Sequence, residues 1–209
     1  SVGNEGPGLG RIQVPGSAKN TLSSGATYMT ADFFDANSGY GIYGYARRYA
    51  HWASRGPTHD GRWKPEVSCM GEWITSASSA SSASCGAHIL QGVSMSTPLC
   101  AGAAAIVRQY FEQGWYGTGV QGSAAGINPT AALVKAMMIN SATTQSLDYW
   151  YQEDPEASSQ WILEEHPVPM NQHTGFGRVD LTQVLWLGAL TPGFKLTFLN
   201  KERVQPGVY

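Results

Sequence analysis

One short segment constrains this chain more than any other: a serine and a proline that open a run of small apolar residues. Ser94 precedes Pro98 by four positions, and residues 101–107 are alanine, glycine, isoleucine and valine. Proline is tolerated in the first turn of a helix because its missing N–H has no helical partner there. The pattern therefore predicts a buried helix over residues 97–112. Free N–H groups at a helix N-terminus stabilise negative charge, which is what acyl transfer to a serine needs.

Taken alone, Ser94 is more often a helix N-cap than a nucleophile, since serine is a favoured capping residue. Its neighbours decide between the readings. Residues 92–102 (GVSMSTPLCAG) resemble the catalytic-serine segment of the subtilisin-like serine proteases, and residues 3–7 (GNEGP) resemble the oxyanion segment of the same family. Read alone, GNEGP is turn composition. The resemblance implies that Ser94 is the nucleophile and that Asn4 donates a side-chain N–H to the oxyanion.

Further segments at residues 14–27, 52–67 and 174–181 also resemble this family. In the family, the first of these segments forms the floor of the pocket that binds the substrate residue before the scissile bond. The resemblance implies that Pro15 follows a cis peptide bond and that Val14 favours apolar or aromatic substrate residues. The middle segment contains Arg55 and Lys64, for which we expect structural roles. The expected substrate-binding residues are Gly3, Val14, Pro15 and Gly16.

The resemblance covers residues 1–187 and implies an α/β fold. We expect the C-terminal portion of a three-layer subtilisin-like catalytic domain, in which helices flank a mostly parallel central sheet. Residues 188–209 are expected to begin a following β-rich segment or to form a tail. A cut parallel sheet leaves an unpaired edge, so we expect the N-terminal half of the same domain as a partner.

The aspartate and histidine segments of the family's catalytic triad are absent from the sequence. Without a base, a serine hydroxyl is a weak nucleophile at neutral pH. His88 and His173 are candidates for a local base, and His88 is expected in an exposed loop. We expect this polypeptide alone to hydrolyse no peptide bonds and the missing triad residues to lie on an N-terminal part. The alternative is a non-catalytic subtilase-like module used for binding or architecture.

Composition excludes several other classes. The net charge of −2 and the pI near 6.2 give no basic surface for a nucleic acid. No apolar run reaches the roughly 18 residues that a membrane span needs. Only 13% of residues are charged, against about 25% in ordinary soluble domains. This composition is typical of a loop-rich secreted or vesicular hydrolase with protein or peptide substrates.

Three cysteines leave at least one thiol unpaired within the chain. Cys69 and Cys85 flank a serine-rich segment and either pair or stay free, whereas Cys100 is expected to be a small buried residue. Their spacing fits no zinc site, so no metal site is assigned. The acidic stretch within residues 136–177 makes structural calcium an open alternative, and no cofactor is required.

The sequence also supports four predictions about local structure. We expect a strand near residues 21–26, and a helix over 128–140 that Asn128 caps. Residues 33–49 are expected to form a loop. The low-complexity segment 76–84 is expected to be disordered, since it carries neither charge nor large apolar groups.

Overall fold

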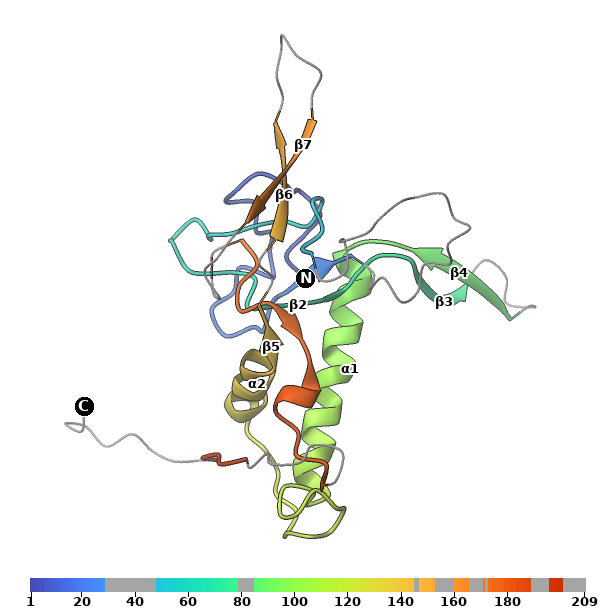
Figure 1. Cartoon of the computed structure of the whole chain (residues 1–209), viewed down its shortest axis with the longest axis vertical. Coiled ribbons are helices and arrows are strands. Elements are labelled where there is room, and N and C mark those ends of the chain that lie inside the picture. The colour runs from blue at the N-terminus through green and yellow to red at the C-terminus, as the bar shows by residue number, and fades with distance from the viewer. Residues whose placement is uncertain are drawn as a thin grey trace, which may run out of the picture. The chain divides into compact units, whose positions relative to one another are not determined.

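The computed structural model describes eight stretches of the chain (Figure 1), which are residues 1–28, 48–78, 85–144, 147–152, 160–165, 171, 173–188 and 196–200. The loop expected at residues 33–49 lies almost wholly outside them. The chain divides into two compact units. Unit 1 comprises residues 1–101 and 143–179, and unit 2 comprises residues 102–142 and 180–209. No helix in the described stretches combines the length and the apolar character that crossing a bilayer demands.

A four-stranded sheet has the order β1-β2-β8-β5. Its strands are β1 (Ser24–Thr27), β2 (Val67–Met70), β8 (Arg178–Val179) and β5 (Ala142–Thr143). The β1–β2 and β2–β8 pairs are both parallel. Every residue of β1 is buried, as is usual for strands of a parallel sheet covered on both faces. The predicted α/β fold is confirmed, and the strand expected near residues 21–26 is found as β1.

A buried ion pair joins the entrances of β1 and β2. Lys64 Nζ lies 2.6 Å from Glu66 Oε1, and both side chains are almost fully buried. The other carboxylate oxygen of Glu66 accepts hydrogen bonds from the backbone N–H and the hydroxyl of Ser23, each at 2.7 Å. Lys64 also donates to the carbonyl of Thr21 at 2.8 Å. These contacts fit the structural role expected for Lys64.

Two antiparallel hairpins complete unit 1 (Figure 1). One joins β3 (Ile74–Ser78) to β4 (Gly86–Leu90), and the other joins β6 (Leu147–Gln152) to β7 (Gln160–Glu165). The expectation of disorder over 76–84 is wrong for residues 76–78, because cross-strand pairing with β4 orders them; residues 79–84 lie outside the described stretches. His88 is exposed as expected, but it lies on β4 and not in a loop.

Two helices follow the hairpin. Helix α1 (Val93–Glu112) begins four residues before the predicted start. Helix α2 (Ala131–Asn140) begins later than predicted, and its N-cap is Thr130, whose side chain accepts a hydrogen bond from Leu133 N. The expected cap, Asn128, is wrong: it precedes the helix, and its side chain accepts a hydrogen bond from Arg108 at 2.7 Å. A short 3-10 helix, η2 (Leu181–Gln183), follows β8.

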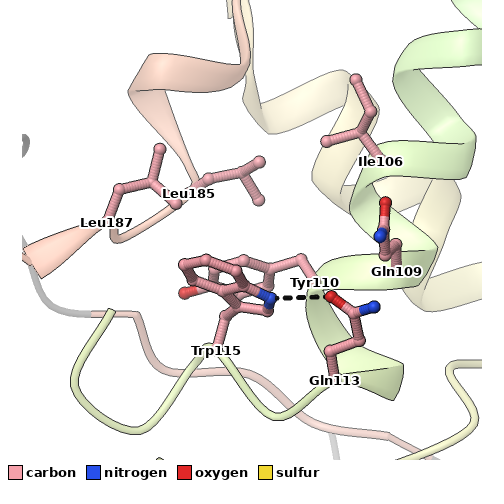
Figure 2. Close-up of a pocket in the computed structure, with 7 residues that line it drawn as sticks. All are labelled: Ile106, Gln109, Tyr110, Gln113, Trp115, Leu185 and Leu187. Atoms are coloured by element: carbon pink, nitrogen blue, oxygen red, sulfur yellow. Dashed lines mark hydrogen bonds between the residues drawn. The ribbon is translucent and has the colours of Figure 1, made fainter. Parts of the chain in front are cut away.

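Unit 2 contains a small apolar pocket of about 200 Å³ near the C-terminal end of α1 (Figure 2). Trp115 donates from its ring nitrogen to Gln113 Oε1 at 3.1 Å across one side of it. The pocket is lined by Ile106, Gln109, Tyr110, Gln113, Trp115, Leu185 and Leu187.

Residues 196–200 contain no strand, but two of their side chains contact other parts of unit 2. The ring of Phe198 meets Phe111 and Tyr116 at centroid distances of 4.8 and 5.1 Å. Asn200 accepts a hydrogen bond from Thr130 N at 3.1 Å. The boundary expected between residues 187 and 188 remains a prediction.

Candidate functional site

Ser94 lies in the first turn of α1 and is exposed to solvent. The other N–H groups of that turn have acceptors: Met95 N and Ser96 N both donate to the carbonyl of Gly92, at 3.0 and 3.3 Å. Val93 N donates to Asn4 Oδ1 at 2.9 Å. Within the described stretches the Ser94 N–H has no such acceptor. A helix N-terminus therefore presents one free backbone donor at the residue that carries the hydroxyl.

Asn4 meets this helix end although it lies 89 residues earlier in the sequence than Val93. Only the oxygen of an amide side chain accepts a hydrogen bond, so the bond from Val93 fixes which way the amide faces. Its Nδ2 then keeps both hydrogens free with respect to the described residues. The structure thus brings the two predicted residues together and leaves each with an unused N–H donor.

Gly92 shows that both donors border the same small space. A Cβ built on Gly92 would lie 3.6 Å from Asn4 Nδ2 and 3.7 Å from Ser94 N. The φ of Gly92 is +147°, a backbone conformation that residues with side chains rarely adopt. Glycine keeps this space empty. Two N–H groups and the positive end of a helix dipole are therefore available to an oxygen that gains negative charge there.

The main chain on either side of Asn4 is held by one residue, Ser54. Its N–H donates to the carbonyl of Gly3 at 2.9 Å. Its hydroxyl accepts from Glu5 N at 3.0 Å. The sequence placed Ser54 in a family-like segment and gave it no role. Its only signal was its position within that segment, and the contact appears only once the chain is folded.

Three groups anchor the first turns of α1 to the sheet. Ser96 is fully buried, donates to the carbonyl of Gly25 at 2.5 Å and accepts from Cys69 N at 3.2 Å. One helical turn later, Cys100 forms a disulfide with Cys69 across a Cα–Cα distance of 5.8 Å. Ser24 Oγ contacts both Ser96 Oγ, at 2.9 Å, and Cys100 Sγ, at 3.2 Å.

The disulfide corrects the open pairing of Cys69 with Cys85. Cys85 is free and exposed, just before β4. Cys69 lies opposite α1 because β2 passes next to the start of the helix. There Ser96 Oγ also accepts a hydrogen bond from Cys69 N. Cys100 is buried as predicted, with 5% of its surface exposed, but it is half of a disulfide and not a simple apolar residue.

The four predicted substrate-binding residues differ in how far they are exposed or covered by neighbouring residues. A Cβ on Gly3 would lie 2.6 Å from the side chain of Gln13, so Gln13 covers Gly3. Gln13 also donates to Glu5 Oε1 at 3.3 Å. Val14 is 84% exposed, whereas Gly16 packs against the carbonyl of Ser1. The cis bond expected before Pro15 is confirmed. Their contact with substrate remains a prediction.

No histidine in the described stretches hydrogen-bonds to Ser94. His51, which is half-buried, pairs through Nδ1 with the hydroxyl of Tyr28. His173 belongs to the turn that Asn171 stabilises, and His166 lies outside the described residues. Burial and the nearby Arg55 lower the pKa of His51.

Over the same described stretches, no group of three His, Cys, Asp or Glu could hold a metal ion. Calcium remains a prediction.

The sequence model of the Subtilase family matches residues 1–165. The chain belongs to the subtilase family. Two related proteins of Dictyostelium discoideum are named serine protease/ABC transporter B family proteins. The subtilase chain is 35% identical to tagB over 153 residues and 42% identical to tagD over 103 residues. These matches cover 68% and 44% of the subtilase chain. They span only 8% and 6% of the two longer proteins.

A solved structure, the S41 psychrophilic protease, shares the fold. It superposes with a TM-score of 0.52 at 21% identity, over 86% of this chain and 46% of that protein. The likeness supports the α/β architecture read from the strands and helices. The subtilase chain therefore corresponds to about half the length of that protease.

Proposed function

We propose that this subtilase chain carries the nucleophile and the oxyanion site of a serine endopeptidase. One observation carries the proposal. The hydroxyl of Ser94 lies at a helix N-terminus where the unused N–H groups of Ser94 and Asn4 border one small space beside Gly92. A helix cap alone would not require an asparagine from 90 residues earlier to face the same space.

The proposed reaction is acyl transfer from a protein or peptide substrate. Ser94 Oγ attacks the scissile carbonyl carbon while a base removes its proton, and the carbonyl oxygen becomes an oxyanion. Asn4 Nδ2 and Ser94 N donate to that oxyanion. The tetrahedral intermediate collapses as the protonated base gives its proton to the leaving nitrogen, so the amine leaves and Ser94 carries the acyl group. Water, deprotonated by the same base, attacks the acyl carbon. The bond to Ser94 Oγ then breaks as the base returns the proton to Oγ, and the acid is released.

The base and its orienting carboxylate belong, in this proposal, to an N-terminal part of the same domain. An exposed apolar face on α1 supports such a partner, because the hydrophobic effect favours covering it. Leu99 is 42% exposed and Ile106 is 51% exposed, and the small residues at 101, 102 and 105 are exposed with them. The isolated chain is then inactive because the base is missing.

A secreted or vesicular location is proposed on different grounds. The Cys69–Cys100 disulfide is typical of proteins that mature in an oxidising compartment. Trapping free thiols during isolation from the source would test this, since a cytosolic protein would yield both cysteines in the reduced form.

Labelling with a fluorophosphonate probe tests the proposed reaction. The full-length protein that contains this chain should be modified at Ser94, and the Ser94→Ala variant should not. Peptide mapping identifies the modified residue, and the isolated chain serves as the control that lacks a base. A full-length protein that folds but is neither labelled nor able to cleave peptides would overturn the proposal and favour the non-catalytic module.

A further inference from the structure

Ser54 makes hydrogen bonds on both sides of Asn4. Its N–H donates to the carbonyl of Gly3 at 2.9 Å, and its hydroxyl accepts from Glu5 N at 3.0 Å. One residue thus fixes the peptide group before Asn4 and the one after it. Since those two peptide planes set the backbone dihedrals of Asn4, they also set the direction in which its side chain leaves the main chain.

Ser54 is itself held firmly. It is fully buried, and its carbonyl accepts a hydrogen bond of 2.8 Å from the hydroxyl of Tyr49, which is also fully buried. A neighbouring bond of 3.0 Å, from Gly6 N to the carbonyl of Trp52, continues the contact between the two segments. The serine is therefore a fixed point against which the exposed Asn4 is oriented.

The hydroxyl supplies a contact that the main chain does not. Within the described stretches, Ser54 Oγ is the sole acceptor for the N–H of Glu5. An alanine at position 54 would keep the bond to Gly3 but release the peptide that follows Asn4. The main chain at Asn4 would then be held by Ser54 on one side only.

We propose that Ser54 is a positioning residue for the oxyanion donor Asn4. The inference rests on the proposed function, because orientation of Asn4 matters to rate only if Asn4 stabilises the oxyanion. Ser54 touches no reacting atom. It acts by holding Asn4 Nδ2 in place before the reaction begins, and small misplacements of such a group lower rates by up to about 10²-fold.

The test is a double-mutant cycle in the full-length protein, with the variants Ser54→Ala, Asn4→Ala and the double variant. Kinetics with a peptide substrate and the rate of fluorophosphonate labelling are measured for each. Ser54→Ala should lower kcat about ten-fold or more with KM nearly unchanged. In the Asn4→Ala background the same substitution should have almost no further effect.

Ser141→Ala is the matched control, because Ser141 is also fully buried and its hydroxyl bonds to the backbone carbonyl of Met138, in unit 2. It should leave kcat unchanged. Ser54→Cys, which keeps a similar volume and weakens the acceptor, repeats the cycle if the alanine variant does not fold.

The outcomes separate the two proposals. If the wild-type protein is not labelled at Ser94, or if Asn4→Ala has no effect, the proposed function fails. If Asn4→Ala lowers kcat and Ser54→Ala does not, the inference about Ser54 fails alone. Equal losses from Ser54→Ala with and without Asn4 would also overturn it, since the serine would then act on general stability.

Discussion

Asn4 Oδ1 accepts a hydrogen bond of 2.9 Å from Val93 N, and this contact joins the start of the chain to the helix that carries Ser94. It gives Asn4 two separable roles. The oxygen satisfies a backbone N–H at a helix end, and the nitrogen remains free to donate to another group. A substitution that keeps the oxygen and removes the nitrogen separates structure from chemistry.

We expect Asn4→Asp to keep the fold and lose the activity. The carboxylate still accepts from Val93 N, and a negative charge near a helix N-terminus is favourable by about 0.3–1 kcal/mol. It offers no N–H to an oxyanion, so kcat should fall by at least the roughly 10²–10³ that loss of this donor costs in a subtilisin. Thermal melting and kinetics on the same full-length preparation measure both effects. Unchanged kcat would contradict the donor role.

The Cys69–Cys100 disulfide predicts a simple thiol count. Of the three cysteines in this chain, one, Cys85, should react with a maleimide in the folded protein, and all three should react after denaturation and reduction, as peptide mapping would show. The bond spans 31 residues of chain, for which loop closure predicts about 3–4 kcal/mol of stabilisation. The double variant Cys69→Ala/Cys100→Ala should therefore have a free energy of unfolding that is lower by much of this amount. Cys85→Ser, at an exposed site, should change it by less than about 0.5 kcal/mol.

Removing either partner of the buried Lys64–Glu66 ion pair should lower the free energy of unfolding. Glu66→Gln removes the negative charge that lies 2.6 Å from the buried Lys64 ammonium, and breaking such a pair costs about 3–5 kcal/mol. The matched control is Glu112→Gln, which breaks the exposed Arg108–Glu112 pair at 2.8 Å and should cost less than about 0.5 kcal/mol. Urea unfolding measures both. Similar losses in the two variants would show that burial does not govern the effect.

Sequence reasoning found the two ends of the candidate site but not what holds them. Ser94 and Asn4 were identified from local residue patterns, and the parallel sheet followed from the same resemblance. The Ser54 bonds and the Cys69–Cys100 bond were missed because each depends on three-dimensional proximity between segments far apart in the chain. The helix caps show the same limit at short range. Asn128 and Thr130 are both good capping residues, but in the fold the Asn128 side chain accepts a hydrogen bond from Arg108, 20 residues earlier, and Thr130 caps α2.

His51 gives the fold a pH dependence with a definite sign. Burial and the positive charge of Arg55 lower its pKa below the ordinary value of 6.5. Its backbone N–H donates to the hydroxyl of Tyr28 at 3.3 Å, so the residue is held in this setting. Because the unfolded chain binds the proton more tightly, the stabilising contribution is complete above about pH 6.5 and is lost as the pH falls through the lower, folded pKa.

The free energy of unfolding should therefore fall as the pH drops below about 6.5, and His51→Gln should flatten that slope. Urea unfolding of the full-length protein at several pH values measures the slope. Titration of the His51 ring by NMR in the folded protein reports the pKa directly. A ring that titrates at or above 6.5 would contradict the assignment, because burial beside Arg55 favours only the neutral imidazole.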